Sequence, residues 1–277
     1  MIYKVINIPD IYPDELFYSF YCRYHLKCGS RNVKTTNRIL WSGKQKCFCS
    51  LLFPTSLHDV VLATNTRLLS DESIINHTAL PFYKNFMTQK DYEGCLKHAL
   101  YGGNGIYSNV RALVGNEFCP YIIKYCPVCQ KEKPLTISGA LSPAFVKVCP
   151  KHKCMLLTRK TEIEHLTGNL LALTGKDYDN TLIPCRDEKE IRLAKMAEYF
   201  FHLKGINIDL LKDVLNNKVE EYKCTCNQNI NIQKFMKNIK IPLDYIDSIV
   251  KLYDSIEELD QDIKRQLNKW NKITLKC

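Results

Sequence analysis

The 277-residue chain contains two short pairs of metal-binding side chains, Cys126-Pro127-Val128-Cys129 and, after nineteen residues, Cys149-Pro150-Lys151-His152. Each pair supplies two ligands from one tight turn, and the intervening loop lets the pairs converge on a tetrahedral Zn²⁺ ion. Three thiolates and one imidazole fill all four positions, so no position is left for an activated water. The spacing therefore predicts one structural Zn²⁺ ion, held by Cys126, Cys129, Cys149 and His152, that stabilises the fold and does not catalyse a reaction.

Other cysteines and histidines leave alternatives open. Cys154 is either a substitute ligand or a small buried side chain. Cys224-Thr225-Cys226 can supply a second half-site, but the side chains of a Cys-x-Cys pair on a strand point to opposite faces. One face of the first predicted helix is either a metal-binding face or a packed one, and it carries Cys22, His25 and Cys28.

The composition is that of a globular protein, with 45% apolar and 25% charged residues. A membrane-spanning helix needs about 18 consecutive apolar residues, and the sequence contains no such run. The N-terminus lacks the apolar core of a signal peptide. Fourteen cysteines in a chain of this length without such a signal indicate reduced thiols. We therefore expect a cytoplasmic protein without a membrane partner.

The positive charge is confined to the part of the chain that carries the quartet. The net charge is +10, and residues 1–160 hold 21 Lys and Arg against 10 Asp and Glu, whereas residues 161–277 hold 18 against 19. Residues 111–160 alone hold 9 basic and 2 acidic side chains. A charge segregated in this way is typical of a polyanion-binding surface, although solubility alone also favours a net charge.

The N-terminal sequence predicts two helices joined by a glycine turn. Pro13-Asp14-Glu15 suits a helix start, because proline fits the first turn and carboxylates favour the positive end of the helix dipole. Aromatic residues then recur at helical spacing as far as Cys28, and Gly29 ends the helix. A shorter basic helix is predicted over 35–41. This outline is either a DNA-reading helix-turn-helix or a packed pair, and its candidate DNA contacts are Arg31, Lys34 and Arg38.

The rest of the chain predicts a mainly α fold with a small metal-held module. Helices are expected over 56–65, 70–77, 88–101, 187–204, 207–217 and 256–270, and a helix-turn-helix outline over 231–253 with Ile241-Pro242 in its turn. Thr55 and Ser70 are expected to cap the first two helices, Ser70 with a partner in Asp71-Glu72, and Gly102-Gly103 ends the third. Short strands are expected in the module. The predicted organisation is a helical N-terminal region (1–118), a zinc-finger module (119–160), a linker (161–186), and a helical C-terminal region with a further helix-turn-helix outline (187–277).

Three blocks of the sequence, in order, resemble the TniQ/TnsD family of transposon target-site selection proteins. The first is Pro13-Asp14-Glu15-Leu16-Phe17-Tyr18-Ser19 with Arg23, and the second is Ile75-Asn76-His77-Thr78-Ala79-Leu80-Pro81-Phe82-Tyr83. The third is the quartet, extended to Val148 and Leu156. The resemblance covers about residues 9–158. Between the zinc pairs the family usually has Trp and Arg, whereas this chain reads Thr136-Ile137-Ser138-Gly139-Ala140-Leu141.

The resemblance implies a bacterial recruiter. Such proteins bind double-stranded target DNA, or a complex already on it such as an RNA-guided effector complex, and hand the site to a AAA+ ATPase regulator of the transposase. The alternative is a protein-interaction module that docks on an ATPase or effector assembly with little direct DNA contact. No enzyme is expected, because the His-x-Glu of zinc deaminases and the Walker A sequence of P-loop ATPases are both missing.

Several basic residues near the quartet are candidate phosphate contacts: Lys131, Lys133, Lys147, Lys151 and Lys153. They are equally suited to acidic residues on a partner protein. Arg23 is predicted either to contact phosphate or to form a buried ion pair, for example with Glu15. His77 is predicted to make a buried hydrogen bond.

Overall fold

The computed structural model describes residues 8–29, 32–42, 51–64, 70–103, 105–114, 122–160, 181–226, 239 and 241–274. Within these ranges the chain is mainly helical with one two-stranded sheet, which confirms the predicted fold class. The elements are α1 (Phe17–Lys27), α2 (Val33–Leu40), α3 (Leu57–Ala63), α4 (Asp71–Ile75), α5 (Leu80–Lys84), α6 (Gln89–Tyr101), α7 (Gly105–Val114), β1 (Ile122–Tyr125), α8 (Pro127–Glu132), η2 (Gly139–Leu141), β2 (Leu157–Lys160), α10 (Glu188–His202), α11 (Ile208–Cys226), α13 (Pro242–Leu252) and α14 (Ile256–Thr274).

The first helix begins later than the sequence predicts. Pro13 and Asp14 form a turn in which Asp14 has φ 63°, and α1 begins at Phe17. The buried Glu15 explains the delay, because its carboxylate accepts hydrogen bonds from the backbone N–H of Tyr12 and the hydroxyl of Ser19. The predicted end is confirmed: Gly29 has φ 65°, a left-handed conformation that glycine adopts without strain.

Of the other helices predicted in the N-terminal region, the starts are close to the predicted residues, and two further helices were not predicted. Ser70 caps α4 as predicted, but its capping partner is Ser73 rather than the neighbouring acids. The residue at the N-cap position of α3 is Ser56, not Thr55. The sequence analysis missed the short helices α5 and α7, and at the start of α5 no side chain makes a capping hydrogen bond.

A small antiparallel sheet opens and closes the module. β1 pairs with β2 so that Tyr125 stands opposite Leu157. The predicted short strands therefore exist, although the apolar run 145–148 forms only an isolated bridge, Val148 to Met155. The loop between the cysteine pairs docks on the helical region, because Leu16 N–H donates to Ile137 O at 2.7 Å and Gly139 N–H donates to Asp14 O at 2.7 Å.

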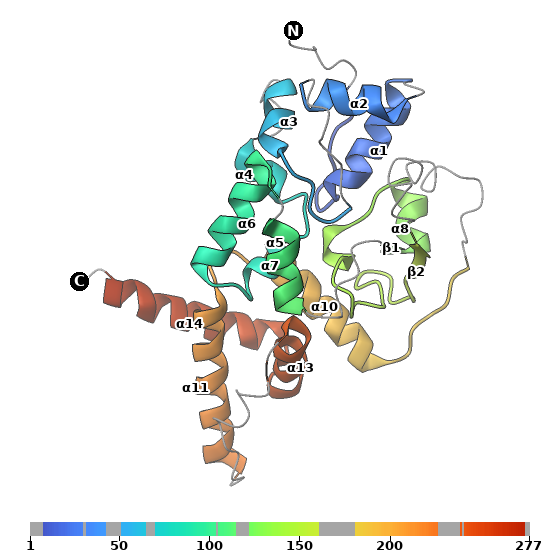
Figure 1. Cartoon of the computed structure of the whole chain (residues 1–277). Coiled ribbons are helices and arrows are strands. Elements are labelled where there is room, and N and C mark those ends of the chain that lie inside the picture. The colour runs from blue at the N-terminus through green and yellow to red at the C-terminus, as the bar shows by residue number, and fades with distance from the viewer. Residues whose placement is uncertain are drawn as a thin grey trace.

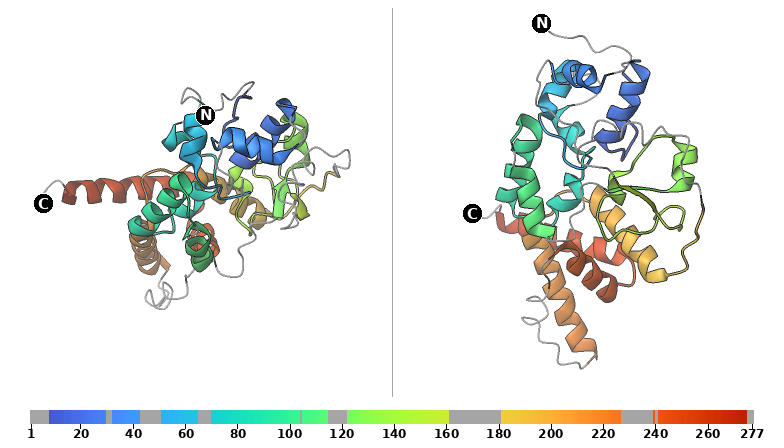
Figure 2. Two further views of the ribbon diagram at one scale, coloured as in Figure 1. Left: turned by 45° about the horizontal axis from the view of Figure 1, so that its top comes forward. Right: turned by 45° about the vertical axis from the view of Figure 1, so that its right-hand side comes forward.

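The C-terminal helices agree with the sequence except in length. The predicted helix over 187–204 forms α10, and Asp187 caps it by accepting from the N–H groups of Lys189 and Glu190. The helix that follows Asn207 extends to Cys226, well beyond the predicted residue 217. Of the predicted helix-turn-helix over 231–253, only the second helix, α13, lies within the described residues. Figures 1 and 2 show α11 and α14 projecting away from the rest of the molecule.

One hydrophobic core connects the helical parts to the module. It includes Phe17 of α1, Phe82 of α5, Val148 of the module and Phe200 of α10, all fully buried. Figure 1 shows α10 passing between the module and the C-terminal helices. No helix in the described part of the chain has the length and apolar content needed to cross a membrane. The division at residues 118, 160 and 186 stays a prediction.

Candidate metal centre

The sheet brings the two ligand pairs together. Cys126 directly follows β1 and occupies the N-cap of α8, so Cys129 lies one turn further along that helix. The second pair lies at the corner of a hairpin in which Cys149 N–H donates to Cys154 O at 2.8 Å. Because β1 and β2 pair in register up to Tyr125 and Leu157, the hairpin corner lies beside the start of α8.

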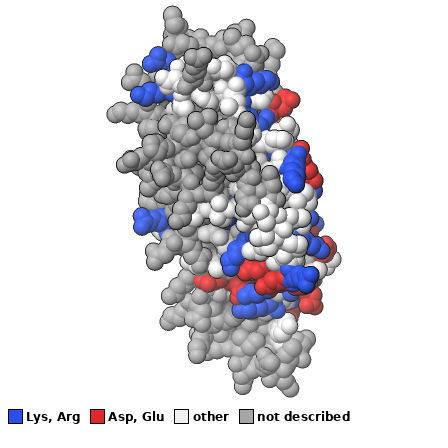
Figure 3. Space-filling view, turned by 90° about the vertical axis from the view of Figure 1, so that its right-hand side faces the viewer, with Lys and Arg blue, Asp and Glu red and all other residues white. Residues whose placement is uncertain are grey.

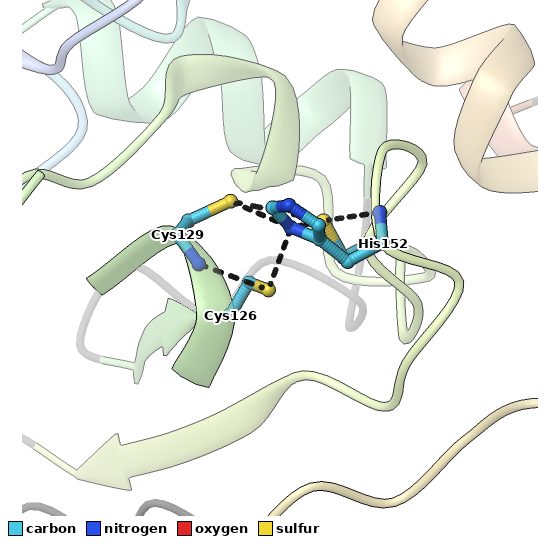
Figure 4. A group of neighbouring side chains, drawn as sticks. Cys126, Cys129 and His152 are labelled. Atoms are coloured by element: carbon cyan, nitrogen blue, oxygen red, sulfur yellow. Dashed lines mark hydrogen bonds between the residues drawn. The ribbon is translucent and has the colours of Figure 1, made fainter. Parts of the chain in front are cut away.

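The four donor atoms lie at the separations that a tetrahedral ion requires. Nδ1 of His152 is 3.4 Å from Cys126 Sγ, 3.3 Å from Cys129 Sγ and 3.6 Å from Cys149 Sγ. The Sγ atoms of Cys129 and Cys149 are 3.9 Å apart. With Zn–S bonds of about 2.3 Å and Zn–N bonds of about 2.0 Å, neighbouring ligands stand about 3.5 to 3.8 Å apart. The residues can therefore hold a metal ion (Figure 4).

Backbone geometry supports the thiolate form of two ligands. The Cys129 N–H points at Cys126 Sγ, 3.5 Å away, and the His152 N–H points at Cys149 Sγ, 3.4 Å away. Both contacts arise because each pair sits in a tight turn that contains a proline, Pro127 or Pro150. An N–H group directed at sulfur favours the negative charge that a metal-bound thiolate carries.

The thiols also influence one another. Hydrogen bonds from Cys129 and Cys149 lower the pKa of Cys126 far below its usual value. The same hydrogen bonds raise the pKa of Cys129, and the bond with Cys126 raises that of Cys149. Three thiolates in one small volume repel each other, so their joint deprotonation requires a cation. This requirement matches a site built for a divalent metal.

Glu132 supports the imidazole from behind, and the sequence analysis missed it. Its Oε1 lies 3.3 Å from Nε2 of His152, and its Oε2 accepts from Lys151 Nζ at 2.6 Å. Since Nδ1 faces the sulfurs, Nε2–H donates to the carboxylate, an arrangement that fixes the tautomer and orientation of a metal-binding histidine. A signal was present: Glu132 follows Cys129 by three residues, which places both on one face of α8.

The remaining cysteines do not add a second group within the described residues. Cys154 is buried with its Sγ 3.5 Å from Cys126 Sγ, but it is not a member of the four-residue group, and burial raises its pKa to about 12. Cys22 and His25 belong to a packed helix face, because Cys22 is fully buried and His25 Nδ1 bonds to Thr36 Oγ1 at 2.6 Å. The side chains of Cys224 and Cys226 lie outside the described part of the structure.

The lysines of the module are partly engaged with acids. Lys147 pairs with Glu190 of α10 at 3.1 Å, and Lys151 pairs with Glu132. Lys133 lies over the Tyr12 ring, 5.3 Å from its centre. Lys131 and Lys153 are exposed. Figure 3 shows basic and acidic side chains interleaved on the lower part of the face that it draws.

The candidate contacts of the first helix pair are only partly visible. Lys34 and Arg38 are exposed and stand one helical turn apart on α2, so both side chains can reach the same ligand. Arg31 lies outside the described residues. Whether these side chains contact DNA stays a prediction.

Two residues of the N-terminal blocks have structural partners. Arg23 donates to both carboxylate oxygens of Glu15, at 2.9 Å from its Nε, which confirms the ion-pair alternative. His77 Nδ1 lies 2.8 Å from Glu15 O, which confirms the predicted hydrogen bond. Both contacts hold the turn before α1. Lys124, another basic residue of the module, donates to the carbonyls of Pro143 and Val146 and so supports the loop.

Comparison with protein families matches the part of the chain that contains the quartet. The model of the TniQ family matches residues 7–156, a segment that begins before α1 and ends just before β2. The match includes the whole quartet and excludes the helices from α10 onward. A search of curated proteins found no match to the chain.

Proposed function

Since the chain belongs to the TniQ family, whose members are transposon-associated targeting proteins, we propose that it is a bacterial DNA-targeting adaptor without catalytic activity. In this role it binds target DNA, or a complex already on the DNA, and recruits a AAA+ ATPase that regulates the transposase. The family match over 7–156 carries the proposal. The charge segregated in residues 1–160 supports it, because a polyanion partner favours such a distribution.

The metal in this proposal is one structural Zn²⁺ ion. The ligand set of three thiols and one imidazole and the donor separations near 3.5 Å fit zinc. With four protein ligands the ion has no open position for water, so its contribution is to hold β1, α8 and the hairpin in place. The Glu132 carboxylate would keep the imidazole in the tautomer that binds through Nδ1.

Direct DNA contact would use those predicted contacts that are exposed and that have neither an acidic nor an aromatic partner among the described residues: Lys34, Arg38, Lys131 and Lys153. Phosphate contacts release counterions, so the affinity should fall by about 0.9 log unit per log unit of salt for each phosphate neutralised. A set of four such contacts would make the salt dependence steep.

A second function is favoured by the ion pairs of the module. Because Glu190 and Glu132 offset Lys147 and Lys151, the module offers less free charge to DNA than its composition suggests. The C-terminal part is nearly neutral, and its helices α11 and α14 project from the body. Both features suit a protein-interaction module that docks on an ATPase or effector assembly with little direct DNA contact.

A gel-shift experiment separates the two functions. Binding of the full chain to random duplex DNA is measured across a salt series, with and without the AAA+ ATPase encoded beside the transposase. The adaptor predicts direct binding that weakens in the double variant Lys34→Gln/Arg38→Gln but not in the charge-matched control Lys90→Gln/Lys97→Gln, whose side chains are exposed on α6. Binding that appears only with the ATPase favours the docking module. No binding to DNA or ATPase would contradict both.

A further inference from the structure

A pocket outside the metal centre lies where the turn before α1, the connection between α4 and α5, and the end of α10 meet. Its volume is about 280 Å³, at the small end of ligand-binding pockets, so it suits a small group and not a large molecule. Figure 1 shows α5 lying beside α10, and the turn before α1 reaches the end of α10 through Asp14 and His202. The quartet does not line this pocket.

Basic side chains line the pocket from separate segments. Lys84 comes from the end of α5, Lys204 follows α10, and His77 and His202 come from two further positions. Asp14 is the one carboxylate among the lining residues, and its Oδ1 lies 3.5 Å from Nδ1 of His202. The acid is therefore engaged with a histidine, and the two lysines remain as the main charges of the pocket.

Lys84 is half-buried and lies near a second cation. Its Nζ lies 5.4 Å from the centre of the Tyr92 ring. Burial lowers the pKa of Lys84, and the nearby charge of Lys204 lowers it further. Among the described residues no carboxylate lies within ion-pair distance of either ammonium. Two neighbouring cations, one of them partly removed from water, gain free energy from an anion between them.

We propose that this pocket binds a phosphate group between Lys84 and Lys204, with His77 and His202 at its edge. The lining residues come from three separate segments, which suits a tetrahedral group with several acceptor oxygens. A planar carboxylate is better matched by the fork of an arginine, and no arginine is among the described residues that line the pocket. Nδ1 of His77 is held by the Glu15 carbonyl, so Nε2 is the ring nitrogen left for a ligand.

The proposal stands apart from the DNA contacts proposed above. It uses neither α2 nor the lysines of the module, and the phosphate belongs either to a nucleic-acid backbone or to a free phosphate compound. The pocket joins the family-matched part of the chain to α10, so a bound phosphate would tie the two parts together.

Isothermal titration with inorganic phosphate at constant ionic strength, balanced with chloride, tests the pocket in the full chain. Saturable binding is expected, and Lys84→Gln and Lys204→Gln should each weaken it roughly tenfold, the effect of losing one charge-assisted hydrogen bond. The control Lys90→Gln, at an exposed site on α6, should bind like the wild type. Lys204 is exposed, so its variant tests the pocket even if Lys84→Gln fails to fold.

Equal binding by the wild type and Lys204→Gln, or equal weakening by Lys90→Gln, would overturn the proposal. Tighter binding of an oligoglutamate peptide than of phosphate, lost in the same variants, would overturn it in favour of an acidic protein partner. A parallel titration with short duplex DNA identifies the source: a DNA affinity lowered by Lys204→Gln indicates a backbone phosphate, and an unchanged one indicates a free phosphate compound. If the wild-type chain binds DNA strongly but does not bind inorganic phosphate, the phosphate-binding pocket is rejected and the proposed adaptor function is retained.

Discussion

The module that carries the candidate metal centre and the C-terminal helices differ in how much regular structure they contain. In the module, β1 and β2 have four residues each and α8 has six, so little regular structure exists to bury apolar surface. α10 has fifteen residues and buries seven of them, including Phe200 and Phe201. Short elements bury too little apolar surface to offset the chain entropy lost on folding, so they need a cross-link such as a bound metal ion. A long amphipathic helix is stabilised by packing its apolar face against other helices. The four predictions that follow test this difference.

Removing a ligand should have the largest effect. Cys149→Ser is expected to abolish metal binding and unfold the module while α10 to α14 stay helical, because metal binding contributes on the order of 10 kcal/mol in zinc-finger peptides. Metal analysis and hydrogen exchange over 122–160 measure this. The matched control is Cys154→Ala, which removes a buried thiol outside the ligand group and should keep the metal. Loss of metal in the control instead would make Cys154 a ligand.

Truncating a buried side chain of α10 should lower the stability of the chain without releasing a bound metal ion. Phe200 is fully buried and its ring lies 5.4 Å from that of Phe86. Phe200→Ala should lower the free energy of unfolding by about 3–5 kcal/mol, through lost burial and a cavity. Denaturant unfolding monitored by far-UV circular dichroism measures the change, and Lys195→Ala on the exposed side of α10 is the control. A simultaneous loss of metal would show that the two regions depend on each other.

The contact between the regions is tested at Gly139. A Cβ at this position would overlap the Phe201 ring of α10, so Gly139→Ala forces the loop and the helix apart. Thermal unfolding should report a loss of about 1–3 kcal/mol, the usual cost of overpacking. Gly94→Ala on α6 meets its nearest atom only at 3.9 Å and should be neutral or stabilising. Equal stability of the two variants would mean that the module docks loosely.

The smallest effect on the fold is expected from changing Glu132, whose carboxylate contacts Nε2 of His152. Glu132→Gln should weaken metal affinity by about 10- to 100-fold, the usual consequence of losing such a carboxylate, with little change in secondary structure. Competition with a chromophoric chelator measures the affinity. Lys151→Gln removes the ion pair with Glu132 but leaves its contact with His152, so it should retain most of the affinity. If Glu132→Gln and Lys151→Gln weaken metal affinity equally, the ion pair between Glu132 and Lys151 supports the metal centre, and the contact between Glu132 and His152 does not.

Local signals explain which parts of the fold could be predicted. Gly29 and the Asp187 cap mark helix ends through the backbone of a few neighbouring residues, so the sequence reveals them directly. The start of α1 was misjudged because Pro13-Asp14-Glu15 satisfies the local rule for a helix start. Its actual conformation is set by distant groups, Ser138 through the bridge to Glu15 and His77 through the Glu15 carbonyl. Such partners have no local signature.

The sequence by itself determined which four residues could hold a metal ion, because chelation by a tight turn depends on spacing within four residues. Its ordered motifs also indicated the family. Only the tertiary structure decided the surroundings of each cation: Lys147 pairs with Glu190, 43 positions further along the chain, and the charge of Lys204 lowers the pKa of the half-buried Lys84. Charge in a sequence can be counted, but its effect depends on distance and burial, and both are set by long-range packing.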